Sequence, residues 1–389
     1  MSNQNLRILG KGKTALAIKE SYKNAILYDD NDKELYDINS EDLTVVSPGI
    51  PPHNYLVQNT KNLISEYDLF QKKMPFNIWI SGTNGKTTTT QMLQHILEEK
   101  GSVCGGNIGT PLSNLDKKAQ IWILETSSFT LHYTTQAKPN IYLLLPISDD
   151  HLSWHGSFKE YENSKLKPLD LMDENDTAII PEVYKDYKTK AKIITYKNSL
   201  DLAEKFDMNI TSIEFREPFL MDSILALSIE KMLFDTISYD KMNTFIQDAH
   251  RLEELKDSKG RIWVDDSKAT NVDAAIQALK SYNDKKIFLI LGGEDKGMEL
   301  TPLFEELKKY DAQIFAIGAN VLRLEALADK FNITCTVSNT LELAVQNISN
   351  NFEEDTNTVA LLSPAAASFD QFSSYEHRGD EFKKFVTLI

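Results

Sequence analysis

The chain has few cysteines, a deficit of positive charge and no long apolar run, and each of these absences excludes a class of protein. Only Cys104 and Cys335 occur among the 389 residues, which excludes a disulfide framework or a cysteine-based zinc site and suits a reducing cytoplasm. The 42 Lys and Arg against 57 Asp and Glu, a formal net charge of −15, argue against a nucleic-acid partner. An isolated basic pocket for a small phosphorylated ligand is still allowed.

Signals for membrane insertion and export are absent as well. No apolar run approaches the roughly 18–20 residues that span a bilayer, and residues 1–6 are polar, with no apolar signal core. Hydrophobic residues make up 41% and charged residues 25%, which is typical of a folded soluble protein. We therefore expect a cytoplasmic protein with no membrane insertion. At roughly 100–200 residues per domain, its length predicts two or three domains.

Short, continuous apolar runs recur along the chain and alternate with helical patterns at 87–100, 273–282 and 303–310. Continuous apolarity is typical of strands buried on both faces of a parallel sheet, so the sequence predicts an α/β fold with mostly parallel sheets. In such sheets ligands bind at the carboxyl ends of the strands. The runs are Arg7–Leu9, Ile78–Ile80, Ile121–Leu124, Ile141–Leu145, Ile262–Val264, Ile287–Leu291, Ile314–Ile317 and Val359–Leu362.

Strands restart after polar helices near 72–75 and 248–251. These positions predict three domains, over residues 1–74, 75–247 and 248–389.

The strongest motif is the segment Gly82-Thr83-Asn84-Gly85-Lys86-Thr87-Thr88, between an apolar run and a helical pattern. A glycine-rich turn there aims backbone N–H groups and a helix N-terminus at phosphate oxygens. Lys86 would reach the β- and γ-phosphates and the Thr87 hydroxyl would bind Mg²⁺, which predicts an ATP site. The general Walker pattern has Gly where Ile80 stands, so the match is to a variant. The alternative is a tight strand–helix turn with a solvated lysine.

Further candidate groups follow the next two apolar runs. Glu125 ends the Ile121 run and suits a Mg²⁺ ligand beside a phosphate loop, although alone it could be a solvated acid. His151 and His155 are spaced for one helix face and could suggest zinc, but Gly156 and the turn residues before it argue against a helix, and no third His or Cys follows. Lys165, taken alone, is typical of a solvated helical lysine.

Three C-terminal apolar runs each lead into a polar turn, at 265–271, 292–296 and 363–372. Each turn alone could be a structural connector. Together they would bring Lys268, Lys296 and helix N-termini to one edge of a sheet, which suits a carboxylate-bearing substrate. With an ATP loop in another domain, an active site that bridges domains is expected.

The first 74 residues contain half of a dinucleotide-binding fingerprint, Gly10-Lys11-Gly12, and the Tyr28–Asp30 segment at the end of the next predicted strand. These residues are too few for a full NAD-binding fold, which hydride transfer would need. They therefore favour binding of a nucleotide diphosphate. A second turn, Ser47-Pro48-Gly49, could donate N–H groups to phosphate or be an ordinary Pro-Gly turn.

Taken together, these motifs resemble the Mur ligase family along essentially the whole chain. Four of them, in the family's order, are shared by all its members: Gly82–Thr88, Gly106–Gly109, Glu125–Phe129 and Asp150–His151. The later segments Asp266–Asn271 and Ser363–Phe372, followed by Tyr375–Gly379, resemble the members that add D-glutamate. Related ligases and folylpolyglutamate synthases carry an Asp-Tyr-Ala-His-like turn instead.

The resemblance implies a Rossmann-like first domain, a central P-loop ATPase-like domain and a Rossmann-like last domain. It implies a monomeric ligase of cytoplasmic peptidoglycan precursor synthesis. With ATP and two Mg²⁺ sites, the enzyme would join D-glutamate to UDP-N-acetylmuramoyl-L-alanine through an acyl phosphate, and its domains would close around the substrates. The alternative is another amino-acid-adding ligase of the Mur and folylpolyglutamate synthase superfamily.

The resemblance also assigns roles to positions of this chain. The catalytic residues would be Lys86, Glu125, His151 and Lys165, and the metal ligands Thr87, Glu125, His151 and a carbamylated Lys165. ATP would contact Gly82, Thr83, Asn84, Gly85, Lys86, Thr87, Thr88, Arg251 and Asp266. The UDP-sugar would contact Thr14, Asp29, Ser47, Pro48, Gly49 and Asn107. D-Glutamate would contact Lys268, Thr270, Lys296, Ser368, Phe369 and Tyr375.

Three features depart from the family's pattern. Ser164 stands where an alanine usually precedes the carbamylated lysine, and Tyr375 stands where phenylalanine is frequent. The first domain is also shorter than is typical.

Overall fold

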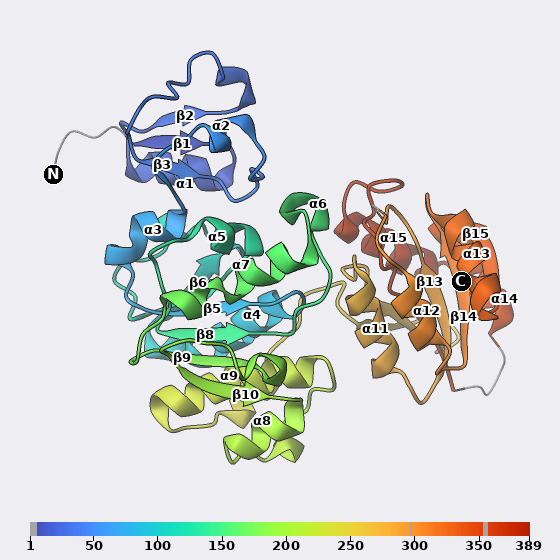
Figure 1. Ribbon diagram of the computed structural model, residues 1–389. Helices are drawn as coiled ribbons and strands as arrows, with labels where there is room; N and C mark the ends of the chain where they lie inside the picture. The colour runs from blue at the N-terminus through green and yellow to red at the C-terminus, as the bar shows by residue number, and fades with distance from the viewer. Residues whose placement is uncertain (1–5, 296, 353–356) are drawn as a thin grey trace. The chain divides into compact units, whose positions relative to one another are not determined.

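The computed structural model describes residues 6–295, 297–352 and 357–389, which form three sheets and their flanking helices (Figure 1). The chain divides into two compact units. Unit 1 comprises residues 1–215 and 219–245 and carries the first two sheets. Unit 2 comprises residues 216–218 and 246–389 and carries the third sheet. The predicted α/β class with mostly parallel sheets is confirmed.

The first sheet of unit 1 has the strand order β2-β1-β3-β4, and its paired strands are parallel. Helix α1 (Lys13–Ser21) follows β1 and buries Ala15 and Ile18 against the sheet's core. The strands are β1 (Arg7–Leu9), β2 (Ile26–Tyr28), β3 (Thr44–Val46) and β4 (Leu63–Ile64).

The second sheet of unit 1 has the order β10-β9-β8-β5-β7-β6, and every pair is parallel. Helix α4 (Lys86–Leu97) follows β5 and packs on α9 (Phe219–Phe234), while α5 (Ser128–Tyr133) packs on α7 (Phe158–Leu171). The central strands are buried, apart from Phe76 at the start of β5, because helices flank the sheet. The strands are β5 (Phe76–Ser81), β6 (Ser102–Gly106), β7 (Ile121–Glu125), β8 (Ile141–Leu144), β9 (Thr177–Pro181) and β10 (Lys192–Tyr196).

Unit 2 contains a sheet of order β11-β12-β16-β13-β14-β15, in which only the β11–β12 pair is antiparallel. Alternate residues of its strands enter two separate hydrophobic clusters, Val264 in one and Trp263 in the other, so both faces are covered. The strands are β11 (Glu253–Lys256), β12 (Ile262–Asp265), β13 (Lys286–Leu291), β14 (Ala312–Ile317), β15 (Cys335–Asn339) and β16 (Thr358–Leu362). The helices are α11 (Val272–Ser281), α12 (Thr301–Leu307), α13 (Val321–Phe331), α14 (Leu341–Asn351) and α15 (Tyr375–Thr387).

The eight apolar runs all form strands, and the three helical patterns form α4, α11 and α12, so these predictions are confirmed. The prediction of no helix at residues 151–155 was wrong. Leu152–His155 form a single helical turn, α6, flanked by left-handed residues His151 (φ 52°) and Gly156 (φ 83°). Gly156 ends this turn as a C-cap, where glycine is favoured, and does not prevent it.

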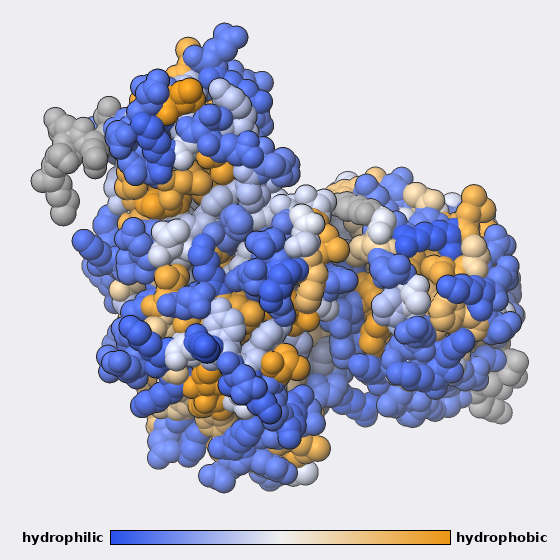
Figure 2. All heavy atoms as spheres, viewed as in Figure 1, coloured by the Kyte–Doolittle hydropathy of each residue, from blue (hydrophilic) through white to orange (hydrophobic). Residues whose placement is uncertain are grey.

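Polar residues cover most of the surface visible in Figure 2, and apolar residues appear there only in scattered patches. Among the described residues, no helix is long and apolar enough to cross a membrane.

Candidate functional site

The phosphate loop joins β5 to α4 at the carboxyl end of the second sheet, and its two glycines are required by geometry. Gly82 and Gly85 have φ values of 143° and 80°, which L side chains rarely adopt. A Cβ on Gly85 would lie 2.6 Å from an Asp222 carboxylate oxygen. Gly85 caps α4 without a side chain. The first N–H groups of that helix can therefore face a phosphate.

Two lysines donate to carbonyls of this loop. Lys86 Nζ lies 2.6 Å from the Thr83 carbonyl oxygen, and Lys165 Nζ of α7 lies 2.7 Å from that of Gly82. The Lys165 side chain is only 1% exposed. Burial and the nearby positive charge of Lys86 hold the pKa of Lys165 well below its usual range. Its amine is therefore favoured in the neutral, nucleophilic form.

Glu125 completes the group around the loop. It ends β7, is 3% exposed, and accepts hydrogen bonds from the Thr87 hydroxyl (2.8 Å) and the Asn107 amide (2.6 Å). A carboxylate beside a hydroxyl and an amide oxygen is a set of hard oxygen donors, the ligands that Mg²⁺ prefers. These residues therefore fit a magnesium ion at the phosphate loop.

His151 lies beside the same region, on the turn after β8. Its ring centroid is 4.7 Å from that of Phe129, and its Nε2 is 3.4 Å from Asp150. Tyr161 of α7 joins this region to the loop, because its hydroxyl lies 3.0 Å from the Thr83 hydroxyl and its ring lies 4.8 Å from Lys165 Nζ.

In the first sheet, the predicted UDP-sugar residues follow the carboxyl ends of β1, β2 and β3. Gly10 (φ 106°) approaches Ser47 so closely that a Cβ would lie 2.5 Å from the Ser47 hydroxyl. That hydroxyl is buried and has no hydrogen-bond partner among the described residues. Asp29 pairs with Lys11 at 3.1 Å. Asn107 instead directs its side-chain amide to Glu125, beside the phosphate loop.

The remaining residues of this set lie on the same segments. Thr14 is in α1, next to Lys13, whose ammonium donates to the Gly109 carbonyl at 2.5 Å. Pro48 and Gly49 continue the turn after β3.

In unit 2, the turns after β12, β16 and β13 meet. The Ser363 hydroxyl donates to Asp266 at 2.8 Å, and residues Glu294 and Ala367 form a bridge between the turns after β13 and β16. Burial raises the pKa of Asp266 to about 7. The structure thus brings together three turns that are distant in sequence.

The predicted D-glutamate residues lie on these turns and on the start of α15. Lys268 Nζ is 3.1 Å from the Tyr375 hydroxyl and 4.9 Å from its ring centroid. Thr270 follows Lys268 in the same turn, and its N–H donates to the Lys268 carbonyl at 2.9 Å. Ser368 is buried, whereas Phe369 is 65% exposed. Lys296 lies outside the described residues.

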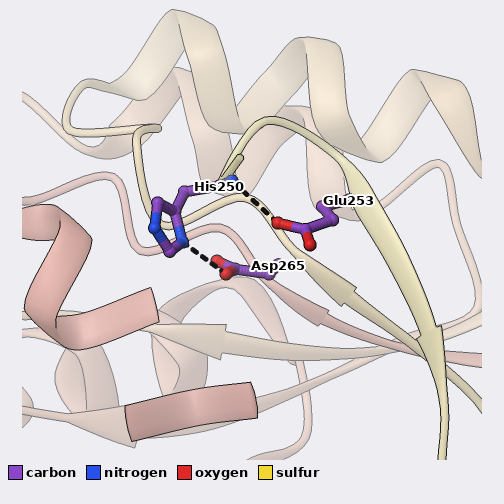
Figure 3. Close-up of side chains that lie close together, drawn as sticks. All are labelled: His250, Glu253 and Asp265. Atoms are coloured by element: carbon purple, nitrogen blue, oxygen red, sulfur yellow. Dashed lines mark hydrogen bonds and ion pairs between the residues drawn. The ribbon is translucent and has the colours of Figure 1, made fainter. Parts of the chain in front are cut away.

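Arg251 is held between two residues in left-handed conformations, His250 (φ 63°) and Leu252 (φ 47°). His250 Nδ1 lies 2.7 Å from Asp265, and the backbone N–H of His250 donates to the Glu253 carboxylate at 3.0 Å (Figure 3). The Leu252 N–H donates to Asp266 at 3.3 Å. Arg251 Nε is buried and has no hydrogen-bond partner among the described residues.

His250, Glu253 and Asp265 are also close enough to hold a metal ion. Lys383 supplies positive charge there, because its Nζ is 3.0 Å from Glu253 and 3.8 Å from Asp265. We therefore describe this group as an ion-pair cluster that pins the Arg251 turn.

Two further buried groups were missed from the sequence. Arg378, 1% exposed, donates to the Ser267 hydroxyl and carbonyl (2.9 and 2.8 Å) and to the Ala366 carbonyl (3.1 Å), joining the turns after β12 and β16. Burial lowers its pKa to about 10. Asp222 accepts from the Thr89 hydroxyl at 2.9 Å beneath the phosphate loop. The Tyr375–Gly379 motif was a signal for Arg378, but no local pattern marks Asp222.

Comparison with known proteins agrees with this geometry. Family models described as "Mur ligase middle domain" and "Mur ligase, glutamate ligase domain" match residues 80–219 and 250–365. The chain is 49% identical to UDP-N-acetylmuramoylalanine--D-glutamate ligase of Campylobacter jejuni (strain RM1221), over 99% of this chain and 100% of the relative. It is 44% identical to the protein of the same name from Helicobacter pylori (strain ATCC 700392 / 26695), over 98% and 99%.

Solved structures share the fold at low sequence identity. MurF ligase from Thermotoga maritima in complex with ADP matches with a TM-score of 0.60 at 15% identity, covering 98% of this chain and 93% of that one. Mycobacterium tuberculosis folylpolyglutamate synthase, complexed with ADP and AMPPCP, matches with a TM-score of 0.55 at 13% identity, covering 82% and 93%. With relatives 44% and 49% identical over nearly its whole length, the chain belongs to the Mur ligase family.

Proposed function

We propose that this protein is an ATP-dependent, ADP-forming ligase that joins D-glutamate to UDP-N-acetylmuramoyl-L-alanine in peptidoglycan precursor synthesis. The observation that carries the proposal is the full-length similarity to relatives named for this reaction. The phosphate loop, with Lys86 and Lys165 at its carbonyls and Glu125 on Thr87, supplies the chemistry that the reaction needs.

The first step is phosphoryl transfer. The carboxylate of the L-alanyl group attacks the γ-phosphorus of ATP, the bond to the β–γ bridging oxygen breaks, and an acyl phosphate and ADP form. Lys86 and the N–H groups at the start of α4 stabilise the charge on the phosphate oxygens. Gly82, Thr83, Asn84, Gly85, Thr87 and Thr88 complete the loop, and Arg251 and Asp266 would contact ATP from unit 2.

Magnesium would neutralise charge on the phosphate and carboxylate oxygens as they approach one another. Thr87, Glu125, His151 and Lys165 would hold two ions. Lys165 would do so as a carbamate: its neutral amine adds to the carbon of CO₂ and releases one proton, which leaves an anion at the end of a long side chain. The buried position and lowered pKa of Lys165 support this modification.

The second step forms the amide. The amine of D-glutamate attacks the acyl carbon, and phosphate leaves from the tetrahedral intermediate. The UDP-sugar would be held by the turns of the first sheet and D-glutamate by the turns of unit 2. The residues concerned are Thr14, Asp29, Ser47, Pro48, Gly49 and Asn107 for the UDP-sugar, and Lys268, Thr270, Lys296, Ser368, Phe369 and Tyr375 for D-glutamate.

Residues 1–74, 75–247 and 248–389 would accordingly act as three binding domains of a monomeric, cytoplasmic enzyme.

The test is coupled ADP release with ATP, Mg²⁺ and UDP-N-acetylmuramoyl-L-alanine. D-Glutamate, L-glutamate, meso-diaminopimelate or no amino acid is added in parallel. ADP formed only with D-glutamate is the expected result. ADP formed with another amino acid would replace the substrate assignment of unit 2, and no ADP in any arm would overturn the proposal.

A further inference from the structure

His155, which the reaction scheme does not use, lies buried where α5, α6 and α7 meet. Its Nε2 is 3.0 Å from the Ser128 hydroxyl of α5, and its Nδ1 is 3.5 Å from the Ser164 hydroxyl of α7. Its ring stacks on Phe129, with centroids 5.6 Å apart and planes at 24°, and meets Tyr161 edge-on at 5.3 Å. It therefore touches all three elements.

The donor and the acceptor in each hydrogen bond of the His155 side chain can be assigned. Ser164 donates its hydroxyl hydrogen to the Glu160 carbonyl at 2.8 Å, so its lone pairs face the imidazole. In a neutral imidazole one nitrogen carries a hydrogen and the other a lone pair. With Nδ1–H directed to Ser164, the Nε2 lone pair accepts the Ser128 hydroxyl hydrogen.

Each element joined by His155 contains a proposed metal ligand or begins within three residues of one. Ser128 lies three residues after Glu125, and His155 ends the single helical turn that His151 caps. Ser164, the departure from the family's alanine, directly precedes Lys165. The ring of Tyr161 connects the same group to the phosphate loop through the Thr83 hydroxyl.

We propose that His155 is a positioning residue whose bonds to Ser128 and Ser164 hold α5, α6 and α7 so that Glu125, His151 and Lys165 converge on one magnesium-binding group. This inference rests on the proposed function and names what orients its metal site. Groups that orient metal ligands typically change metal affinity by about 10- to 100-fold when removed. A histidine that only fills the core would change stability and leave the magnesium requirement unaltered.

The decisive variant is His155→Phe, which keeps an aromatic ring in the stack but removes both nitrogens. We expect the Mg²⁺ concentration for half-maximal ADP formation to rise about tenfold, with the KM for D-glutamate unchanged. In ¹³C-bicarbonate, the carbamate signal of Lys165 in the full-length protein should weaken in ¹³C NMR. His155→Gln, which retains an acceptor for Ser128, should restore much of the wild-type behaviour.

Two other variants keep the test sharp. His95→Phe makes the same change in a histidine of unit 1 whose Nε2 lies 2.9 Å from the Lys241 carbonyl, away from α5, α6 and α7, and it should leave the magnesium requirement near wild type. Ser128→Ala removes the Ser128 partner of the His155–Ser128 hydrogen bond. Its effect on the magnesium requirement should therefore not add to that of His155→Phe.

A wild-type magnesium requirement and carbamate signal in folded His155→Phe would overturn the inference. So would equal shifts in His155→Phe and His95→Phe. The unsubstituted protein is measured in parallel, and if it formed no ADP, the proposed function itself would fail.

Discussion

The two six-stranded sheets each carry candidate site residues at their carboxyl ends, but the side chains there have different kinds of interaction partner. In unit 1, Lys86 and Lys165 donate to backbone carbonyls of the phosphate loop. Next to the Arg251 turn of unit 2, the carboxylates of Glu253 and Asp265 lie 3.0 and 3.8 Å from Lys383 Nζ. The loop lysines thus have neutral partners, whereas these carboxylates have a charged one.

This difference separates a region that can rearrange from one that is fixed. A carbonyl is a neutral partner, so a lysine can exchange it for a phosphate oxygen and gain a charge-assisted bond. Breaking a buried ion pair leaves an uncompensated charge and costs about 3–5 kcal/mol. We therefore expect substitutions in unit 1 to reduce activity and those in unit 2 to reduce stability first.

Lys86→Ala should produce the largest effect and tests the unit 1 side of the comparison. ADP formation should fall by about 10³-fold or more, because the group that faces the transferred phosphate is lost. The midpoint of thermal denaturation should stay near wild type. Lys100→Ala, just beyond the other end of α4, is the matched control and should retain activity. A large loss of stability in Lys86→Ala would contradict the comparison.

Asp266→Asn probes the buried carboxylate of unit 2 by its pH dependence. Burial raises the pKa of Asp266 from an ordinary value of 3.8 to about 7. The folded protein therefore binds this proton more tightly than the unfolded chain, and stability falls as pH rises from about 4 to about 7. Relative to wild type, the variant should gain at most about 1.4 kcal/mol for each pH unit in this window. A pH-independent difference in urea denaturation would refute the assignment.

Arg378→Ala should lower the free energy of unfolding of unit 2 by about 3 kcal/mol, because three bonds are lost and buried acceptors are left unsatisfied. Urea denaturation measures this loss. Arg378→Lys should recover only part of it, since an ammonium cannot reproduce the planar fork of donors. Lys384→Ala, on the exposed face of the same helix, should change stability by less than about 0.5 kcal/mol. Equal effects at positions 378 and 384 would show that the buried bonds of Arg378 do not stabilise unit 2.

Ser363→Ala should have the smallest effect, a loss of about 1 kcal/mol, because it removes one hydrogen bond to Asp266. Ser258→Ala, which removes an exposed bond to the Ile389 carbonyl, is the control and should cost less than half as much. Equal losses of stability in the two variants would show that burial does not increase the contribution of the Ser363–Asp266 hydrogen bond.

Most interior strands of the fold could be predicted because they are buried on both faces and form continuous apolar runs, although the interior strands β3 and β9 were missed. The edge strands could not, since water or a single neighbour satisfies much of their surface. β11 is Glu-Glu-Leu-Lys and β15 is Cys-Thr-Val-Ser-Asn, and neither has a continuous apolar run. The helical turn α6 was also missed, because Gly156 and the turn residues before it are typical of a loop.

The candidate site divides in the same way. The phosphate loop could be predicted because its chemistry lies in seven consecutive residues. Lys165 depended on the family resemblance, since its burial comes from a loop 83 residues away. The bonds of Arg378 to Ser267 span 111 residues, and no local pattern specifies such a contact. His250 likewise gains its partner only when β12 pairs with β11.

The position of β16 has a consequence for the order in which the protein is made. This last strand lies between β12 and β13, pairing in parallel with both. Until residues 358–362 emerge from the ribosome, the two halves of the C-terminal sheet lack the strand that joins them, and each exposes an unpaired edge. Nascent chains therefore carry two open edges through most of the synthesis of this unit, and its sheet can close only after residues 358–362 have emerged.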